Sequence, residues 1–187
     1  CDVTSLEYAR KVESLGADAI IAVNNKAGGH LGDLSPEILI PELVNKCNIP
    51  VISAGGVSNG KDMVKMLSLG ACGVSIGTPF IATHEADISN DYKQAIVDYT
   101  AKDIVVTDRI SGSKCTIINT PYVKTLNLKA NRFERFLFSN KYLKKYLSPK
   151  YRSIFEMGGS IPDAYLLTRS LFLPWEIEEF VGHEIFH

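Results

Sequence analysis

The order of segments in this chain constrains its fold more than any other feature. Over roughly the first eighty residues, segments with helix signals alternate with short apolar segments at Ala17–Val23, Ile49–Ala54 and Ala71–Ile76. The apolar segments lack the polar alternation of half-exposed strands, so they are predicted to be strands covered on both faces. Alternating helices and buried strands predict right-handed βαβ crossovers and one parallel sheet.

Three helices are predicted around these strands, and each has recognisable end signals. Thr4 and Glu7 have the spacing of a capping box at the start of the first helix. Gly16 follows that helix where a left-handed C-cap fits. Ser35 and Asn59 are the predicted N-caps of the second and third helices.

The same helix-to-strand corner occurs twice in the sequence. Leu15-Gly16-Ala17-Asp18 in the first corner is echoed by Leu69-Gly70-Ala71-Cys72 in the second. We infer repeated β/α units. After Pro79 the pattern changes to a helix-prone stretch at 85–101 and to β-prone pieces at 104–107 and 116–119.

Composition excludes several classes of protein. Apolar residues make up 45% and charged residues 22%, as in an ordinary globular protein. No apolar run approaches the roughly 20 residues that span a bilayer, and no segment resembles a signal peptide. Four widely spaced cysteines without a Cys-x-x-Cys pair favour a reducing, cytoplasmic compartment.

Aromatic and basic side chains interleave between residues 132 and 147. Such a mixture can bind nucleic acid. Because the formal net charge is -1, we expect amphipathic helices that pack on the rest of the protein or on a partner, and neither a nucleic acid nor a membrane as a partner.

A glycine-bearing turn follows each predicted strand. In parallel α/β folds, ligands bind outside the carboxyl ends of the strands. Gly55-Gly56 follows the second strand and Gly77-Thr78-Pro79 follows the third, with Thr78 as the expected N-cap of a short helix. Main-chain N–H groups can approach an anion closely where no Cβ intervenes, so two such turns in succession predict a phosphate site.

The turn after the first strand also carries a histidine. His30 follows Gly28 and Gly29 at the predicted ligand-binding edge. A side chain with an ordinary pKa of roughly 6.5 can remove a proton from a carbon acid at neutral pH. We therefore interpret His30 as the candidate catalytic base.

Taken together, these motifs resemble the nitronate monooxygenase family, formerly called 2-nitropropane dioxygenases. The resemblance covers about residues 4 to 125. The motifs that carry it are Gly16-Ala17-Asp18-Ala19-Ile20, Ala27-Gly28-Gly29-His30-Leu31-Gly32, Pro50-Val51-Ile52-Ser53-Ala54-Gly55-Gly56-Val57, Leu69-Gly70-Ala71 and Gly73-Val74-Ser75-Ile76-Gly77-Thr78-Pro79-Phe80. One departure is that Val23-Asn24-Asn25-Lys26 stands where the family commonly has Gln-Gly-x-Glu.

This resemblance implies an FMN-dependent oxidoreductase that oxidises nitronates or nitroalkanes with molecular oxygen. His30 would remove the α-proton of a nitroalkane, and no metal site is expected. The glycine turns and the resemblance together predict the following cofactor-binding residues: Gly28, Gly29, Gly55, Gly56, Ser75, Ile76, Gly77 and Thr78.

The implied fold is a (β/α)₈ barrel, an α/β class of which this chain would form about the last three β/α units. At 187 residues the chain is shorter than the roughly 250 of a complete barrel. We therefore expect residues 1–125 to be the C-terminal part of the barrel and 126–187 a mostly helical extension. The first half of the barrel would lie upstream or on a partner chain, and a homo-oligomer is compatible with this arrangement.

Three alternatives remain at this stage. The flavin-type enoyl-acyl carrier protein reductases resemble the same motifs and reduce a carbon–carbon double bond with a nicotinamide donor. A non-catalytic or partner-dependent flavin-binding fragment would also keep the glycine turns. Finally, His183-Glu184-Ile185-Phe186-His187 fits the His-Glu-x-x-His pattern of zinc peptidases, although the chain ends where a third ligand would follow.

Overall fold

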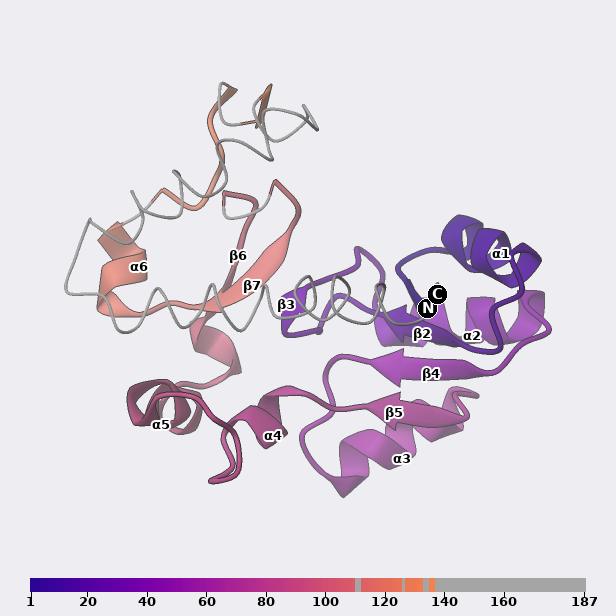
Figure 1. Cartoon of the computed structure of the whole chain (residues 1–187), viewed down its shortest axis with the longest axis horizontal. Coiled ribbons are helices and arrows are strands. Elements are labelled where there is room, and N and C mark those ends of the chain that lie inside the picture. Colours follow the sequence, from indigo (N-terminus) through magenta and orange to yellow (C-terminus); the bar gives the residue numbers. More distant parts are fainter. Residues whose placement is uncertain (110–111, 126, 133–134, 137–187) are drawn as a thin grey trace, which may run out of the picture. The chain divides into compact units, whose positions relative to one another are not determined.

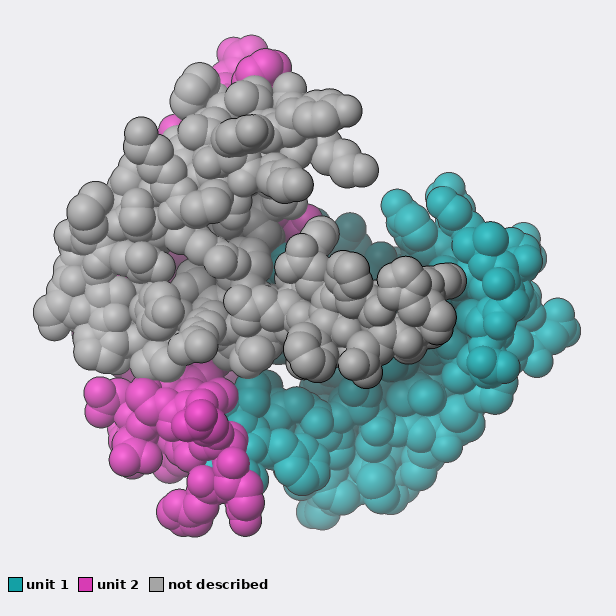
Figure 2. Space-filling model, in the orientation of Figure 1, with its two compact units in different colours: residues 1–83, 114–116 teal, residues 84–113, 117–187 magenta. Residues whose placement is uncertain are grey.

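The computed structural model describes residues 1–109, 112–125, 127–132 and 135–136 (Figure 1). The chain divides into two compact units, which Figure 2 shows in different colours. The first unit contains residues 1–83 and 114–116, and the second contains residues 84–113 and 117–187. The predicted glycine turns and His30 all belong to the first unit.

A parallel sheet forms the centre of the first unit. Its described strands lie in the order β1-β2-β4-β5, and each pairs in parallel with the next. Figure 1 shows β2, β4 and β5 of this sheet side by side. They are β1 (Asp2–Val3), β2 (Ile20–Val23), β4 (Val51–Ala54) and β5 (Gly73–Ser75). The three predicted strands and their parallel arrangement are therefore confirmed, while β1 was not predicted.

Three helices connect these strands, namely α1 (Leu6–Ser14), α2 (Pro36–Lys46) and α3 (Gly60–Ser68). Leu39 and Leu43 of α2 are fully buried in one cluster with Ile20 and Ala22 of β2. Residues on the other face of the same strands, such as Ile21, are only partly buried. Helices thus cover one face of the sheet. Burial of each large aliphatic side chain on that face contributes about 1.5–3 kcal/mol to the free energy of unfolding.

The corners between helices and strands confirm the repeat seen in the sequence. Gly16 after α1 has φ of 90° and Gly70 after α3 has φ of 101°. At the first corner the Gly16 amide donates to Glu13 O and the Ala17 amide to Val12 O; the second corner repeats this pair of bonds. This is the Schellman pattern, in which glycine takes the left-handed position without steric cost.

The N-caps agree with the sequence in part. Asn59 caps α3 as predicted, and its side chain accepts from the amides of Lys61 and Asp62. The predicted capping box at Thr4 is wrong, because Ser5 is the N-cap of α1 and accepts from the Tyr8 amide. Both residues can serve as caps, and a shift of one position is the usual error in locating a helix end.

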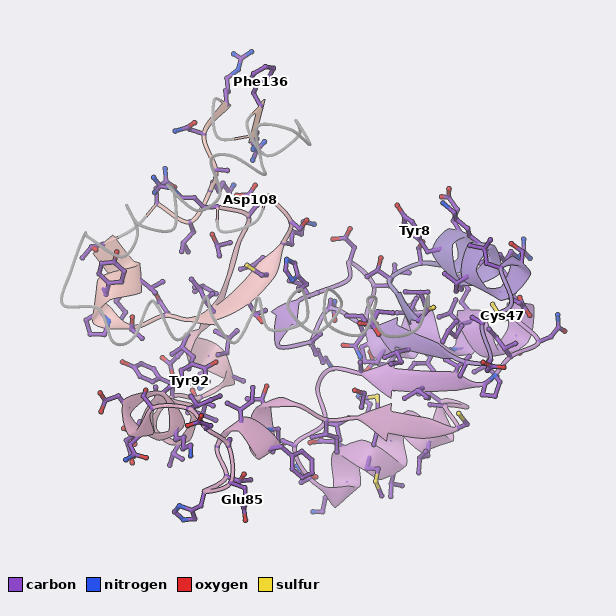
Figure 3. All side chains as sticks on the ribbon, in the orientation of Figure 1. Tyr8, Cys47, Glu85, Tyr92, Asp108 and Phe136 are labelled. Carbon is purple, nitrogen blue, oxygen red and sulfur yellow. The ribbon has the colours of Figure 1, made fainter. Side chains whose placement is uncertain are left out.

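The second unit contains smaller elements. They are α5 (Asn90–Asp98), the 3₁₀ helix η1 (Ala101–Asp103), β6 (Ile104–Thr107), the end of β7 (Cys115–Ile118) and α6 (Pro121–Thr125). Ile117 and Val123 form a buried cluster against which Tyr92, labelled in Figure 3, packs. Asp108, also labelled there, accepts from the Ala130 amide at 2.6 Å, and this bond lowers the pKa of its carboxyl. Because β6 and β7 cover most of 104–107 and 116–119, the predicted β-prone pieces are confirmed as strands.

Several sequence interpretations fall outside the described residues. They include most of the predicted extension at 126–187, nearly all of its aromatic and basic segment, and the His-Glu-x-x-His motif at residues 183–187. Among the residues that are described, no helix combines the length and apolar character needed to span a membrane. Within the same residues, no group of three or more His, Cys, Asp or Glu side chains could hold a metal ion.

Candidate functional site

The turns after β2 and β4 lie against each other at the carboxyl edge of the sheet. Gly55 follows β4 with φ of 107°. A Cβ at this position would lie 2.5 Å from the main-chain nitrogen of Ala27 and 2.7 Å from Oδ1 of Asn24, both in the turn after β2. Because real Cβ atoms do not approach other atoms so closely, only glycine allows the two turns to meet in this way.

The turn after β5 reaches the same place. A Cβ on Gly28 would lie 2.8 Å from Oγ1 of Thr78, which follows β5. Gly28 and Thr78 are both exposed. Three turns that lie along the chain between Asn24 and Thr78 are therefore neighbours, as expected from the parallel order of their strands.

Asn24 is the residue that joins the first two turns. It is fully buried at the end of β2. Its side-chain amide donates to Gly55 O at 3.0 Å, and its Oδ1 accepts from the Lys26 amide at 2.8 Å. Its main-chain N–H donates to Ala54 O at 3.1 Å. A buried amide with both halves bonded in this way fixes the relative position of the turns it links.

His30 lies in a short strand that the sequence did not predict. The strand β3 (Gly29–His30) pairs in antiparallel fashion with β7, so that Gly29 faces Thr116 and His30 faces Cys115. The His30 residue is exposed. The prediction that His30 lies in a turn without strand structure was wrong, because a partner strand far along the sequence gives Gly29 and His30 ladder hydrogen bonds.

The turn after β5 departs in one detail from the prediction. Ser75 ends β5, and Gly77, not Thr78, occupies the N-cap of the short helix α4 (Thr78–Ile81). The Thr78 side chain is therefore not a helix cap and lies beside Gly28 instead. A Cβ on Gly77 would meet no atom within 4 Å, so the chain itself does not require glycine there.

Charged side chains border the turn after β4. The aliphatic stem of Lys26 lies over Gly56, where an added Cβ would be 3.0 Å from it. The Lys26 ammonium is 3.6 Å from Glu37, and the Lys65 ammonium is 2.6 Å from the same carboxylate. The hydrogen bond from Lys65 is the main reason that the pKa of Glu37 is lowered to about 2. All three side chains are partly exposed, so we assign this group little net stability.

Sequence reasoning did not single out two residues that shape this site. Asn24 was noted only as a departure from a motif, and Thr116 only as part of a β-prone piece. An asparagine directly after a buried strand is the one local signal that could have drawn attention to Asn24. No local signal distinguishes Thr116, because its partners Ala27 and Gly29 lie 89 and 87 residues away in sequence.

Comparison with known proteins decides the family. The model of the nitronate monooxygenase family matches residues 1–151. The chain belongs to this family. The family resemblance inferred from the sequence is thus confirmed, and the match supports a flavin as the cofactor class of the site.

Curated relatives agree with this assignment. A probable nitronate monooxygenase from Staphylococcus saprophyticus is 38% identical over 66% of this chain and 38% of its own length. An octahydro-indene-carboxyl-CoA dehydrogenase from Rhodococcus jostii is 32% identical over 69% of this chain and 36% of its own length. The chain therefore spans less than two fifths of these relatives.

Solved structures share the fold. FabK from Thermotoga maritima matches 97% of this chain and 62% of its own, with a TM-score of 0.65 and 29% identity. A nitroalkane oxidase from Streptomyces ansochromogenes matches 80% of this chain and 46% of its own, with a TM-score of 0.63 and 28% identity. The fold class predicted from the sequence is confirmed: β2, β4 and β5 with their helices form part of an α/β barrel of the (β/α)₈ type.

Proposed function

We propose that this chain forms part of an FMN-dependent oxidoreductase that oxidises nitronates or nitroalkanes with molecular oxygen. The observation that carries the proposal is the meeting of three glycine turns at one edge of a parallel sheet, with His30 on one of them. Membership of the nitronate monooxygenase family supports the reaction class. We propose both the substrate class and the choice of FMN over another flavin.

The residues present fit a phosphorylated flavin. An added Cβ would lie 2.8 Å from Thr78 Oγ1 at Gly28 and 2.5 Å from Ala27 N at Gly55, and at Gly56 it would lie 3.0 Å from the stem of Lys26, so these glycines allow the three turns to lie close together. At Gly77 the space that a Cβ would take is open. We assign the main-chain groups of Gly28, Gly29, Gly55, Gly56 and of Ser75, Ile76, Gly77 and Thr78 to the phosphate and ring contacts of FMN.

In the proposed reaction His30 acts before electron transfer. A ring nitrogen of His30 takes the proton from the carbon that bears the nitro group, and the electron pair of the broken C–H bond remains on the resulting nitronate. A flavin held by the glycine turns would supply the redox chemistry between the nitronate and oxygen. Pairing of β3 with β7 fixes the main chain of His30, so the side chain starts from a defined position.

Replacement of His30 tests this proposal in the purified holoprotein. His30→Asn keeps a polar side chain but removes the base, so turnover of a neutral nitroalkane should fall by about 10²-fold or more. Oxidation of a nitronate prepared beforehand should change little, because it needs no proton removal. The absorbance bands of bound flavin provide the control for cofactor retention. Equal rates of nitroalkane turnover in both proteins would exclude His30 as the base.

Reduction of an enoyl thioester is a second activity to be measured in the same purified protein. The relative from Rhodococcus jostii is named as a dehydrogenase of a carboxyl-CoA compound, which supports a thioester as an alternative substrate class. Reduction of an enoyl thioester by NADH or NADPH would be followed at the nicotinamide absorbance band. Thioester turnover without any nitronate oxidation would replace the first proposal with this one. A protein that binds flavin but turns over neither compound would support the non-catalytic alternative.

A further inference from the structure

Thr116 holds the turn that carries His30. Its hydroxyl accepts a hydrogen bond from the Gly29 amide at 3.0 Å. The hydroxyl hydrogen faces two carbonyl oxygens of the same turn, that of Ala27 at 3.1 Å and that of Gly29 at 3.3 Å. One half-buried side chain thus both accepts from and donates to the main chain beside the candidate base.

Neighbouring residues of the same segment strengthen this attachment. Gly29 and His30 pair with Thr116 and Cys115 in the β3–β7 ladder. The Leu31 amide donates to Lys114 O at 3.3 Å, and the Lys114 ammonium pairs with the Asp33 carboxylate. Residues 114–116 therefore lie along the turn from its glycines to Asp33, all within the first unit.

The main chain of this turn needs such support. Gly29 has φ of 78°, a conformation that glycine adopts readily but does not prefer strongly over others. His30 is exposed, and the two residues before it, Gly28 and Gly29, have no Cβ through which to pack. The hydrogen bonds of Thr116 with Ala27 and Gly29 therefore fix the main chain directly before His30.

We propose that Thr116 is a positioning residue for the reaction, which holds the Ala27–Gly29 main chain so that His30 stands in place to remove a proton. The inference rests on the proposed role of His30 as the base. Thr116 touches the main chain of the turn and acts on the chemistry only through it. Loss of its hydroxyl releases the turn and leaves His30 with more than one orientation, which slows proton removal and not the later oxidation.

The test compares Thr116→Val, which keeps the branched shape but removes the hydroxyl, with Thr116→Ser, which keeps the hydroxyl. In the purified holoprotein, Thr116→Val lowers kcat/KM for a neutral nitroalkane by about fivefold, the ratio that corresponds to about 1 kcal/mol for one net hydrogen bond. Oxidation of a nitronate prepared beforehand keeps its rate. Thr116→Ser restores most of the nitroalkane rate.

Thr107 offers a matched control. Its hydroxyl also lies in a strand and also bridges main-chain groups, donating to Leu128 O at 2.7 Å and accepting from the Arg109 amide at 3.1 Å. Thr107→Val removes a similar pair of bonds within the second unit, whereas the glycine turns belong to the first unit. It leaves the ratio of nitroalkane to nitronate rates unchanged, whereas Thr116→Val lowers that ratio.

Hydrogen exchange at the Gly29 amide reports on the attachment without any assay of activity. Thr116→Val speeds this exchange by about fivefold or more, and Thr116→Ser does not. An unchanged exchange rate and an unchanged rate ratio in Thr116→Val overturn the inference, and so does an equal fall in both rates. If Thr116→Val does not fold, the same measurements on Thr116→Ala and Thr116→Ser decide the question.

The two proposals fail in different ways. If His30→Asn leaves the ratio of nitroalkane to nitronate rates unchanged, the assignment of His30 as the base is wrong. Faster exchange of the Gly29 amide in Thr116→Val would then show that Thr116 holds the turn without a catalytic purpose. That result overturns the positioning role. If His30→Asn lowers the ratio and Thr116→Val does not, the base assignment stands and only the role of Thr116 is overturned.

Discussion

Replacing Gly55 with alanine should separate the glycine turns, and the structure gives the size of the effect. Gly55 has φ of 107°, and its new Cβ would lie 2.5 Å from Ala27 N, 2.7 Å from Ala27 Cα and 2.7 Å from Asn24 Oδ1. Two of these atoms are main chain and the third belongs to a fully buried side chain. None of them can move aside as the end of a flexible side chain would.

Two costs add in this variant. Alanine at a positive φ costs about 1–2 kcal/mol in backbone strain. Relief of the overlap must push the turns apart and break the bond from Asn24 to Gly55 O, which costs about 1 kcal/mol or more. Gly55→Ala should therefore lower the free energy of unfolding by about 2–3 kcal/mol or more.

Gly16 provides the matched control, because it has φ of 90° and an added Cβ there would meet no atom within 4 Å. Gly16→Ala thus carries the strain without the overlap, and should lose only about 1–2 kcal/mol. Urea unfolding followed by circular dichroism measures both variants. If Gly55→Ala is no less stable than Gly16→Ala, the turns are not in the close contact described here.

Three further predictions concern the cofactor, a helix cap and acid stability. Gly77→Ala should leave stability within about 0.5 kcal/mol of the parent but weaken FMN binding, measured by fluorescence titration, because the methyl enters the open space beside the proposed phosphate. Asn59→Ala should cost about 1 kcal/mol in urea unfolding, since two amides of α3 lose their acceptor. The lowered pKa of Glu37 means that the small contribution of this exposed ion-pair group to stability is present above about pH 4.5 and is lost as pH falls toward 2, so Glu37→Gln should remove only a small part of the pH dependence of the urea midpoint in that window.

The parts of the fold that local rules determine could be predicted from the sequence. The strands β2, β4 and β5 were recognised because each is a short apolar run between end signals for helices. Gly16 and Gly70 could be assigned to left-handed corners because glycine alone adopts that conformation freely. Local rules also explain the one-residue error in the N-cap of α1. Thr4 and Ser5 both carry a suitable hydroxyl, and only the backbone conformation decides which of them is the cap.

Pairings between distant segments could not be predicted in the same way. The strands β1 and β3 contain two residues each, too few for a period-two pattern to be recognised. They exist because a neighbouring strand, β2 or β7, offers hydrogen-bonding groups at the right place. In the candidate site, the close approach of the glycine turns could be predicted because it follows from the parallel order of the strands. The hydrogen bonds of Thr116 could not be predicted, because they join segments far apart in the sequence.

Asn24 shows how a departure from a family motif can keep the geometry of a site. Where the family commonly has glycine, this chain carries a side chain that must be buried at the end of β2. Burying an amide is costly unless both its donor and its acceptor are bonded. Gly55 O and the Lys26 amide meet those needs, and both belong to the glycine turns themselves. The Asn24 side chain therefore ties the turns together with hydrogen bonds, and it fits in this place because Gly55 has no Cβ.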